Sequence, residues 1–231
     1  MQYNQISETV NDFSYPSPED IENYSKKVGK GKIAPTIPKC PVCNIPSEEF
    51  KRHDVRKRQF FIPVQQIIQI VYCLLVRWRC PGCKKRIPQY PDFALPYKRY
   101  TLQTTLEYSA QYVENDSASY ESVTRQHTIG YQKYPDDERQ LSKSTIWRWV
   151  GTFGQMKNLS LRAHQLILQA DPASFISRHL ANLTVPARKH ATNARKNLLI
   201  QCRKLLHLEA AYQNCFDISL FPNLATTSGF S

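Results

Sequence analysis

The chain has 231 residues, 41% of them hydrophobic, and it carries 31 Lys and Arg residues against 19 Asp and Glu, a formal net charge of +12. This length predicts a sizeable core and two small domains rather than one. The first 25 residues are polar and acidic, which excludes a signal peptide there, and the most apolar run, Ile67–Val76, is too short to cross a bilayer. We therefore expect a cytoplasmic, nucleoid-associated protein with no membrane partner.

The positive charge is concentrated in one stretch of the chain. Residues 26–100 carry 17 Lys and Arg against four Asp and Glu, whereas residues 1–25 carry five acidic residues and no basic one. Residues 156–231 are basic again, with nine against three. Clustered like charges repel one another, so a polyanionic partner is expected, with nucleic acid favoured over an anionic membrane surface. A basic surface that is merely solvated is the alternative.

Residues 1–38 are expected to form a flexible arm, first acidic and then basic. Ser17 can cap one short helix, because Pro18 suits a first turn and acidic residues follow it. From Lys26 to Lys39 the chain alternates Lys with Gly and Pro and has no apolar period, which predicts a flexible segment. Such an arm can lie along phosphates or serve as a plain linker, and both interpretations remain open.

Two C-P-x-C pairs, Cys40-Pro41-Val42-Cys43 and Cys80-Pro81-Gly82-Cys83, are separated by 36 residues. A two-residue gap lets both thiolates of a pair reach one ion, and two pairs complete the tetrahedral sulfur site typical of one structural Zn²⁺. Gly82 suits the turn because it carries no Cβ. Buried free cysteines and disulfides are the alternatives. The predicted metal ligands are Cys40, Cys43, Cys80 and Cys83.

Residues 39–100 are expected to form a four-cysteine zinc ribbon, a small sheet clamped at one end by the metal. Ile67–Arg79 is rich in β-branched and aromatic residues and predicts a strand, with Arg77 and Arg79 together on one face. Pro63 is expected to interrupt the basic segment before it. A sheet this small buries little apolar surface, so the metal should supply much of its stability.

Residues 101–155 are expected to form a helix-turn-helix-like domain of three helices. The third should bury Ile146, Trp149, Val150 and Phe153, which recur at helical spacing. Residues 128–141 separate the second and third helices, more than the usual short turn, so the register stays open. The expected helix caps are Thr101, Ser119, and either Ser142 or Ser144.

Residues 156–221 are expected to form C-terminal helices arranged as a hairpin, with a long helix over Ala191–Tyr212, and residues 222–231 a disordered tail. The predicted fold class is thus α+β and mostly α. It combines a small N-terminal zinc ribbon with four cysteine ligands, a helix-turn-helix-like helical domain and a C-terminal helical hairpin.

Several motifs occur together from Val76 to Val113 and again near residue 147. They are Arg77-Trp78-Arg79-Cys80-Pro81, Cys83, Pro91-Asp92-Phe93, Pro96-Tyr97-Lys98-Arg99-Tyr100, and Ser144-Thr145 with Trp147-Arg148-Trp149. In this order they resemble a family of short bacterial mobile-element proteins, commonly labelled transposase-like or left as a domain of unknown function. Tyr90 departs from the leucine usual there. The resemblance implies DNA binding in the context of an insertion element.

We therefore expect a zinc-dependent, sequence-preferring double-stranded DNA-binding protein of a bacterial mobile element, without enzymatic activity of its own. It would act as an end-binding accessory factor or as a regulator, with a separately encoded recombinase as a second partner. Cations of the ribbon should clamp phosphates, and the third helix should contact base edges. The candidate DNA contacts are Arg56, Lys57, Arg58, Arg77, Arg79, Lys84, Lys85, Arg86, Lys98, Arg99, Lys143, Ser144, Thr145 and Arg148.

Two other functions remain open. A DDE-type transposase, or a subunit of one, would need three carboxylates gathered around two metal ions, and the sequence shows no strands that would carry them. An RNA-binding or protein-adaptor zinc ribbon would use aromatic side chains as stacking surfaces, although small ribbons more often need such residues in the core. The candidates for stacking are Trp78, Tyr90, Tyr97 and Tyr100.

Overall fold

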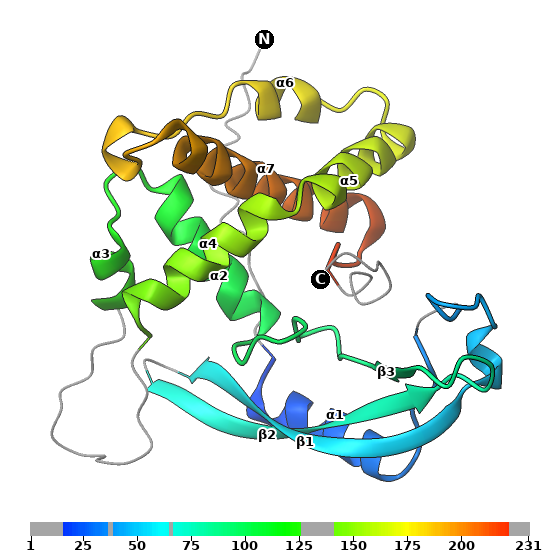
Figure 1. Cartoon of the computed structure of the whole chain (residues 1–231). Coiled ribbons are helices and arrows are strands. Elements are labelled where there is room, and N and C mark those ends of the chain that lie inside the picture. Colours follow the sequence, from blue (N-terminus) through cyan, green and yellow to red (C-terminus); the bar gives the residue numbers. More distant parts are fainter. Residues whose placement is uncertain (1–15, 37–38, 65–66, 126–140, 222–231) are drawn as a thin grey trace, which may run out of the picture.

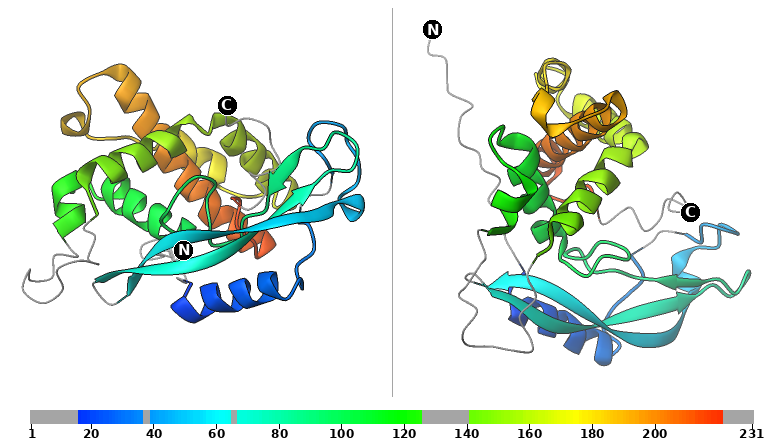
Figure 2. Two further views of the ribbon diagram at one scale, coloured as in Figure 1. Left: turned by 60° about the horizontal axis from the view of Figure 1, so that its bottom comes forward. Right: turned by 60° about the vertical axis from the view of Figure 1, so that its left-hand side comes forward.

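The computed structural model describes residues 16–36, 39–64, 67–125 and 141–221. It has an α+β fold, as expected, in which a twisted three-stranded sheet lies below a layer of helices (Figure 1). The sheet and the helical layer remain distinct in the two further views, and helix α1 (Pro18–Gly29) lies on the side of the sheet that faces away from the helical layer (Figure 2). No helix within these ranges is both long and apolar enough to span a membrane.

Helix α1 confirms the short helix predicted after Ser17, and it corrects the flexible segment predicted from Lys26 because it continues to Gly29. Ser17 and Asp20 form a reciprocal capping box at its start, and Ile21 and Val28 are buried against the sheet. Ser25 Oγ accepts a hydrogen bond of 3.0 Å from the backbone N–H of Leu74, on the flank of β2 opposite β1, where β3 does not reach. The helix is ordered because its apolar side covers an open flank of the sheet. The many lysines of this segment gave no sign of that packing in the sequence.

The sheet is antiparallel with strand order β1 (Lys51–Val64), β2 (Ile67–Arg79), β3 (Arg86–Pro88). The prediction for β2 is confirmed at both ends. Pro63 does not interrupt β1, because β1 is an edge strand and proline needs no ladder partner on the open side. A short 3-10 helix, Ser47–Glu49, leads into β1.

The segment before the first cysteine pair is tied to the sheet through one buried amide. Gln89 Oε1 accepts hydrogen bonds from Trp78 Nε1 at 2.7 Å and from the backbone N–H of Thr36 at 3.3 Å. Gln89 Nε2 donates to the carbonyl of Ala34 at 3.1 Å. Residues 34–36 are therefore held in place and are not part of a flexible linker.

The helical layer begins with the three helices expected from the sequence. Thr101, Ser119 and Ser142 cap them through bonds to backbone N–H groups, and Asn115 ends the first. The layer comprises α2 (Leu102–Glu114), α3 (Tyr120–Arg125), α4 (Lys143–Gln155), α5 (Lys157–Ala170), α6 (Ile176–Ala181), a 3-10 turn (Ala187–Lys189) and α7 (Asn193–Phe216). The insertion at 128–141 lies almost wholly outside the described residues, so the register of the helix-turn-helix stays open.

Helices α4, α5 and α7 form the centre of the layer. Ile146, Trp149, Val150 and Phe153 are all buried, as their spacing predicts. A Cβ built at Gly154 of α4 would overlap the backbone carbonyl of Leu198 in α7, so these helices meet at a point where no side chain fits. The long C-terminal helix was predicted at 191–212 and is observed at 193–216, packed against α5 as the expected hairpin.

A buried carboxylate closes the C-terminal end of the described chain. Glu209 of α7 is fully buried and accepts hydrogen bonds from Gln213 Nε2, Ser219 Oγ and the backbone N–H of Leu220 at 2.6–2.8 Å. These bonds return residues 219–221 to the core, where Phe221 packs against Phe153 at 5.5 Å between ring centroids. The expected disordered tail, 222–231, lies outside the described residues.

The sheet and the helical layer share one apolar core. Phe61 and Ile68, near the hairpin end of the sheet, belong to the same buried cluster as α2, α4 and α7. The ring of Tyr100 joins the two parts, at 5.1 Å from Phe61 and 4.9 Å from Trp149 between centroids. The boundary predicted at residue 100 therefore falls in a packed junction.

Candidate metal centre and basic surface

The two cysteine pairs form matching turns at the end of the sheet away from the hairpin. In each turn the residue after the second cysteine, Asn44 or Lys84, has a positive φ, 59° or 61°. Backbone hydrogen bonds close both loops in the same way, from Asn44 N to Cys40 O at 2.9 Å and from Lys84 N to Cys80 O at 3.1 Å. The local pattern C-P-x-C thus produces the same knuckle twice.

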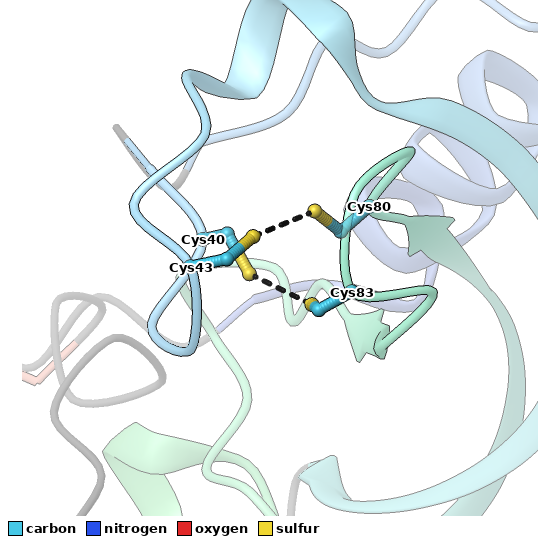
Figure 3. Close-up of side chains that lie close together, drawn as sticks. All are labelled: Cys40, Cys43, Cys80 and Cys83. Carbon is cyan, nitrogen blue, oxygen red and sulfur yellow. Dashed lines mark hydrogen bonds between the residues drawn. The ribbon is translucent and has the colours of Figure 1, made fainter.

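The knuckles turn their sulfur atoms toward one another (Figure 3). Across the gap, Cys40 Sγ lies 3.5 Å from Cys83 Sγ, and Cys43 Sγ lies 3.4 Å from Cys80 Sγ. All four sulfurs lie within 4.8 Å of one another. A tetrahedral ion with metal–sulfur bonds of about 2.3 Å holds its sulfurs about 3.8 Å apart, so the cluster matches a four-sulfur metal site.

The ionisation of the thiols also fits a cation. The backbone N–H of Ile45 is the main cause that lowers the pKa of Cys43 to about 6. The N–H of Lys85 lowers the pKa of Cys83, but burial and the neighbouring sulfurs outweigh it and raise that pKa to about 11. Four thiolates this close repel one another, so all four ionise together only around a positive ion.

The alternatives for the cysteines are resolved by the same geometry. All seven cysteines are free, so the disulfide interpretation is wrong. Cys73 and Cys202 are buried apart from the cluster, and burial raises the pKa of Cys73 to about 11. The four predicted ligands are therefore the cysteines that can hold a metal ion.

Gly82 has a different role from the one predicted. The strained backbone conformation falls on Asn44 and Lys84 and not on Gly82. A Cβ at Gly82 would overlap Ile45 Cδ1 of the opposite knuckle and lie 3.5 Å from Cys43 Sγ. Glycine therefore favours the close approach of the two turns, because a larger residue would force the Ile45 side chain to move, and it is not needed for their dihedral angles.

A basic patch surrounds the second knuckle, and we call it the knuckle patch. It consists of Arg79, Lys84, Lys85 and Arg86, all of which are exposed. Lys84 Nζ bonds to the carbonyl of Pro81, but no carboxylate in the described part of the chain pairs with any of the four. These cations are free to meet an anion.

Two of the candidate DNA contacts, Arg58 and Arg77, have hydrogen-bond partners within the protein. Arg77 donates two hydrogen bonds to the Asp54 carboxylate across the strands, the first at 2.6 Å, and only 15% of its side chain is exposed. Arg58 donates to Tyr90 Oη at 3.1 Å and to the carbonyl of Lys98 at 2.7 Å. Both guanidinium groups are already hydrogen-bonded inside the protein, so they are less available to phosphates than the exposed candidates, and their contact with DNA stays a prediction.

Arg56 and Lys57 are exposed on β1, away from the knuckles. Lys57 Nζ lies 4.0 Å above the ring of Tyr72, which is itself half-exposed. This cation–π contact leaves the ammonium group accessible to solvent. Both side chains therefore remain candidates for anion contacts from the middle of the sheet.

A second basic patch, the junction patch, forms where the linker after β3 meets α4. It consists of Lys98, Arg99 and Arg148. Lys98 Nζ donates to Thr152 Oγ1 of α4 at 3.1 Å. Burial, and then the charge of Arg148, lowers the pKa of Lys98, which shows that the two cations are neighbours. Arg99 and Arg148 are exposed.

The start of α4 carries the remaining candidates. Lys143 forms an ion pair of 2.9 Å with Glu121 of α3. Ser144 is exposed and its hydroxyl lies 2.9 Å from that of Ser142, whereas Thr145 is half-buried. Figure 1 places α4 above the hairpin end of the sheet and the knuckles at the opposite end. The start of α4 and the knuckle patch therefore lie towards opposite ends of the sheet, with Arg56 and Lys57 on the strand between them.

The sequence reasoning missed the features that fix these patches. Nothing in the composition identifies Gln89 as a clamp or Lys84 as a residue in a left-handed conformation. Asp54 is one of only four acidic residues among 26–100. Because so few carboxylates are available to pair with arginine there, the sequence could have identified Asp54 as a candidate partner of Arg77.

No curated protein and no solved structure matches the chain. Residues 40–149, just under half of the chain, match the family model of a domain of unknown function (DUF6431). The match starts at the first cysteine of the metal centre and ends within α4, so it contains the four sulfurs, the sheet and the junction patch. The sequence from 40 to 149 is thus similar to a domain to which no activity is assigned.

Proposed function

We propose that this protein binds double-stranded DNA, and that one Zn²⁺ held by the four cysteines keeps the knuckle patch in shape. The observation that carries the proposal is the separation of occupied from unoccupied cations. Arg58 and Arg77 are committed to partners inside the protein. Among the described residues, the cations of the knuckle and junction patches have no carboxylate partner, and all except the half-buried Lys98 are exposed.

The metal centre would neutralise part of the positive charge of the knuckle patch, and the remaining positive charge is available to a ligand. A Zn²⁺ ion with four thiolates carries a net charge of minus two, which the nearby cations of the knuckle patch offset. The patch has four cations, so a positive excess remains there. Neutralising phosphates with such side chains releases counterions, so affinity should fall steeply with salt.

Helix α4 supports a second kind of contact. Its buried side packs on α7, and its other side exposes Ser144, Trp147, Arg148 and Gln155. Polar residues and one arginine near the start of a helix suit hydrogen bonds to base edges in the major groove. We therefore assign phosphate binding to the knuckle patch and sequence preference to Arg148. As part of this proposal, the protein acts within a mobile element as an accessory factor or regulator, alongside a separate recombinase.

Catalysis has less support. Within the described ranges, the four cysteines form the one group of three or more side chains that could hold a metal ion. Four sulfur ligands leave no coordination position for a reacting water. Asp136 and Asp137 fall in a stretch that the structure does not describe. Metal-dependent nicking of DNA that disappears with a single carboxylate substitution would favour a strand-transfer enzyme instead.

The test begins with selection of bound duplexes from a random pool. Affinity is then measured for a selected and a random duplex at several salt concentrations. Replacing Arg79, Lys85 and Arg86 with Ala should weaken both duplexes alike and reduce the salt slope by about 2 to 3. Arg148→Ala should remove most of the preference for the selected duplex.

Arg162→Ala, at an exposed cation of α5, is the matched control and should leave both affinities nearly unchanged. The proposal is wrong if the wild-type protein shows no salt-dependent affinity for duplex DNA. The division of roles is wrong if the two sets of variants change selected and random duplexes in the same way.

A further inference from the structure

Tyr97 combines exposure with an unusual backbone conformation. Its residue surface is 77% exposed, the largest value among the exposed large hydrophobic residues that the structure describes. Its φ of 63° lies in the left-handed region, which bulky side chains rarely adopt. The position therefore costs folding free energy and gains little burial in return.

The neighbouring residues impose this conformation. The backbone N–H of Lys98 donates to the carbonyl of Leu95 at 3.2 Å, which closes a turn. The carbonyl of Lys98 accepts from Arg58, and the carbonyl of Arg99 accepts from the backbone N–H of Phe61 at 2.8 Å. Because the residues that follow the tyrosine are tied to β1, its ring projects from a rigid base.

The other three aromatic candidates are held inside the protein. Trp78 is buried with its indole N–H on Gln89, and Tyr100 packs between Phe61 and Trp149. Tyr90 accepts a hydrogen bond from Arg58 and is half-buried. The expected core role is confirmed for Trp78, and Tyr90 and Tyr100 pack against the core, whereas it is wrong for Tyr97, whose exposed ring is available to a ligand.

The surroundings of Tyr97 suit a nucleotide. It directly precedes Lys98 and Arg99, and Lys98 reaches α4 beside Arg148. An exposed ring next to several cations is the arrangement by which proteins stack on a nucleobase while holding its phosphates. A ring placed on a flexible loop would require the loop to lose conformational freedom on binding, whereas the backbone next to Tyr97 is already held by hydrogen bonds.

We propose that Tyr97 stacks on a nucleobase that has left the base stack of bound DNA. The protein should therefore bind a duplex with a locally unpaired base more tightly than a continuous duplex. This inference rests on the proposed DNA binding, and it adds the structural form of DNA that the junction patch recognises.

The experiment compares two duplexes of the same sequence, one continuous and one with a single unpaired base, by fluorescence anisotropy. The wild-type protein should prefer the second duplex by about ten-fold or more. Tyr97→Phe should keep this preference. Tyr97→Ala should abolish it while changing the affinity for the continuous duplex by less than about two-fold. Phe175→Ala, at another exposed aromatic residue beside an arginine, should behave like the wild type.

Tyr97→Gly separates binding from structure. Glycine adopts a positive φ without strain, so the melting temperature of the Tyr97→Gly protein should rise. The same variant should lose the preference for the duplex with the unpaired base. A residue with only a structural role could not move these two measurements in opposite directions. The proposal is overturned if the wild type binds both duplexes equally, or if Tyr97→Ala keeps the preference. Failure to bind either duplex would refute the proposed function as well.

Discussion

The sheet module and the helical layer differ in what holds them together. Around the knuckles, a small buried cluster including Val76, Trp78 and Ile87 adjoins the metal centre. In the helical layer, one continuous buried cluster runs through α2, α4, α5 and α7. Apolar burial contributes in proportion to area, so the layer can be stable through its core, whereas the knuckle end needs the ion.

The part of the molecule with the most exposed cations is also the part with the smaller apolar core. The knuckle patch has many free cations on a part of the molecule with little core, and a bound ion can hold that part without adding apolar surface. The junction patch has fewer cations but sits on α4, which is fixed by the main core. The two patches should therefore respond differently to the same perturbation.

The largest effect should follow loss of the metal. Replacing Cys80 and Cys83 with Ser should remove metal binding worth on the order of 10 kcal/mol and unfold the knuckles. Hydrogen exchange should show amide protection lost in residues 39–50 and 78–88 and retained in α4 and α7. Cys215→Ser, at an exposed cysteine, is the control and should leave protection unchanged. Protected knuckles in the metal-free double variant would contradict the comparison.

A smaller effect should come from the contact between α4 and α7. Gly154→Ala places a methyl group against the backbone of Leu198, so it should destabilise the protein by about 1–3 kcal/mol. Gly151→Ala is matched on the same helix, where an added Cβ meets nothing within 4 Å. It should stabilise by about 0.5–1 kcal/mol through helix propensity. Urea denaturation measures both, and equal effects would show that the layer does not depend on this close approach.

The smallest effect concerns pH. Burial, the largest influence on Glu209, raises its pKa above the usual 4.5. The folded state then binds this proton more tightly than the unfolded state. Its contribution to stability is full below pH 4.5 and is lost as the pH rises through the raised pKa. Glu209→Gln carries no titrating proton, so its melting temperature should lack this component. If the melting temperatures of the wild type and Glu209→Gln changed with pH in parallel, Glu209 would not lose a stabilising contribution as the pH rises.

The local elements could be predicted because their signals are local. Helix caps at Ser17, Thr101 and Ser142, the strand Ile67–Arg79 and the four sulfurs each depend on residues a few positions apart. The α+β class and the C-terminal hairpin followed from these elements. The metal centre needed one long-range assumption, that two identical motifs meet.

The parts that could not be predicted depend on long-range pairing. Arg58 and Arg77 look like free cations in the sequence, and only their contacts with Lys98 and Asp54 show otherwise. The start of α1 was predictable from Ser17, but its packing on the sheet was not, because Ile21 and Val28 are buried only when the strands lie beside them. A composition count cannot distinguish a cation that binds a ligand from one that supports the fold.

The cover that α1 gives to β2 bears on how the protein can be divided for study. The matched family region begins at residue 40 and so omits this helix. A recombinant fragment cut to those limits would leave the backbone N–H of Leu74 unpaired on a bare strand flank. Such a flank recruits strands from other molecules, so the fragment should self-associate, and chains that start before Ser17 should stay monodisperse.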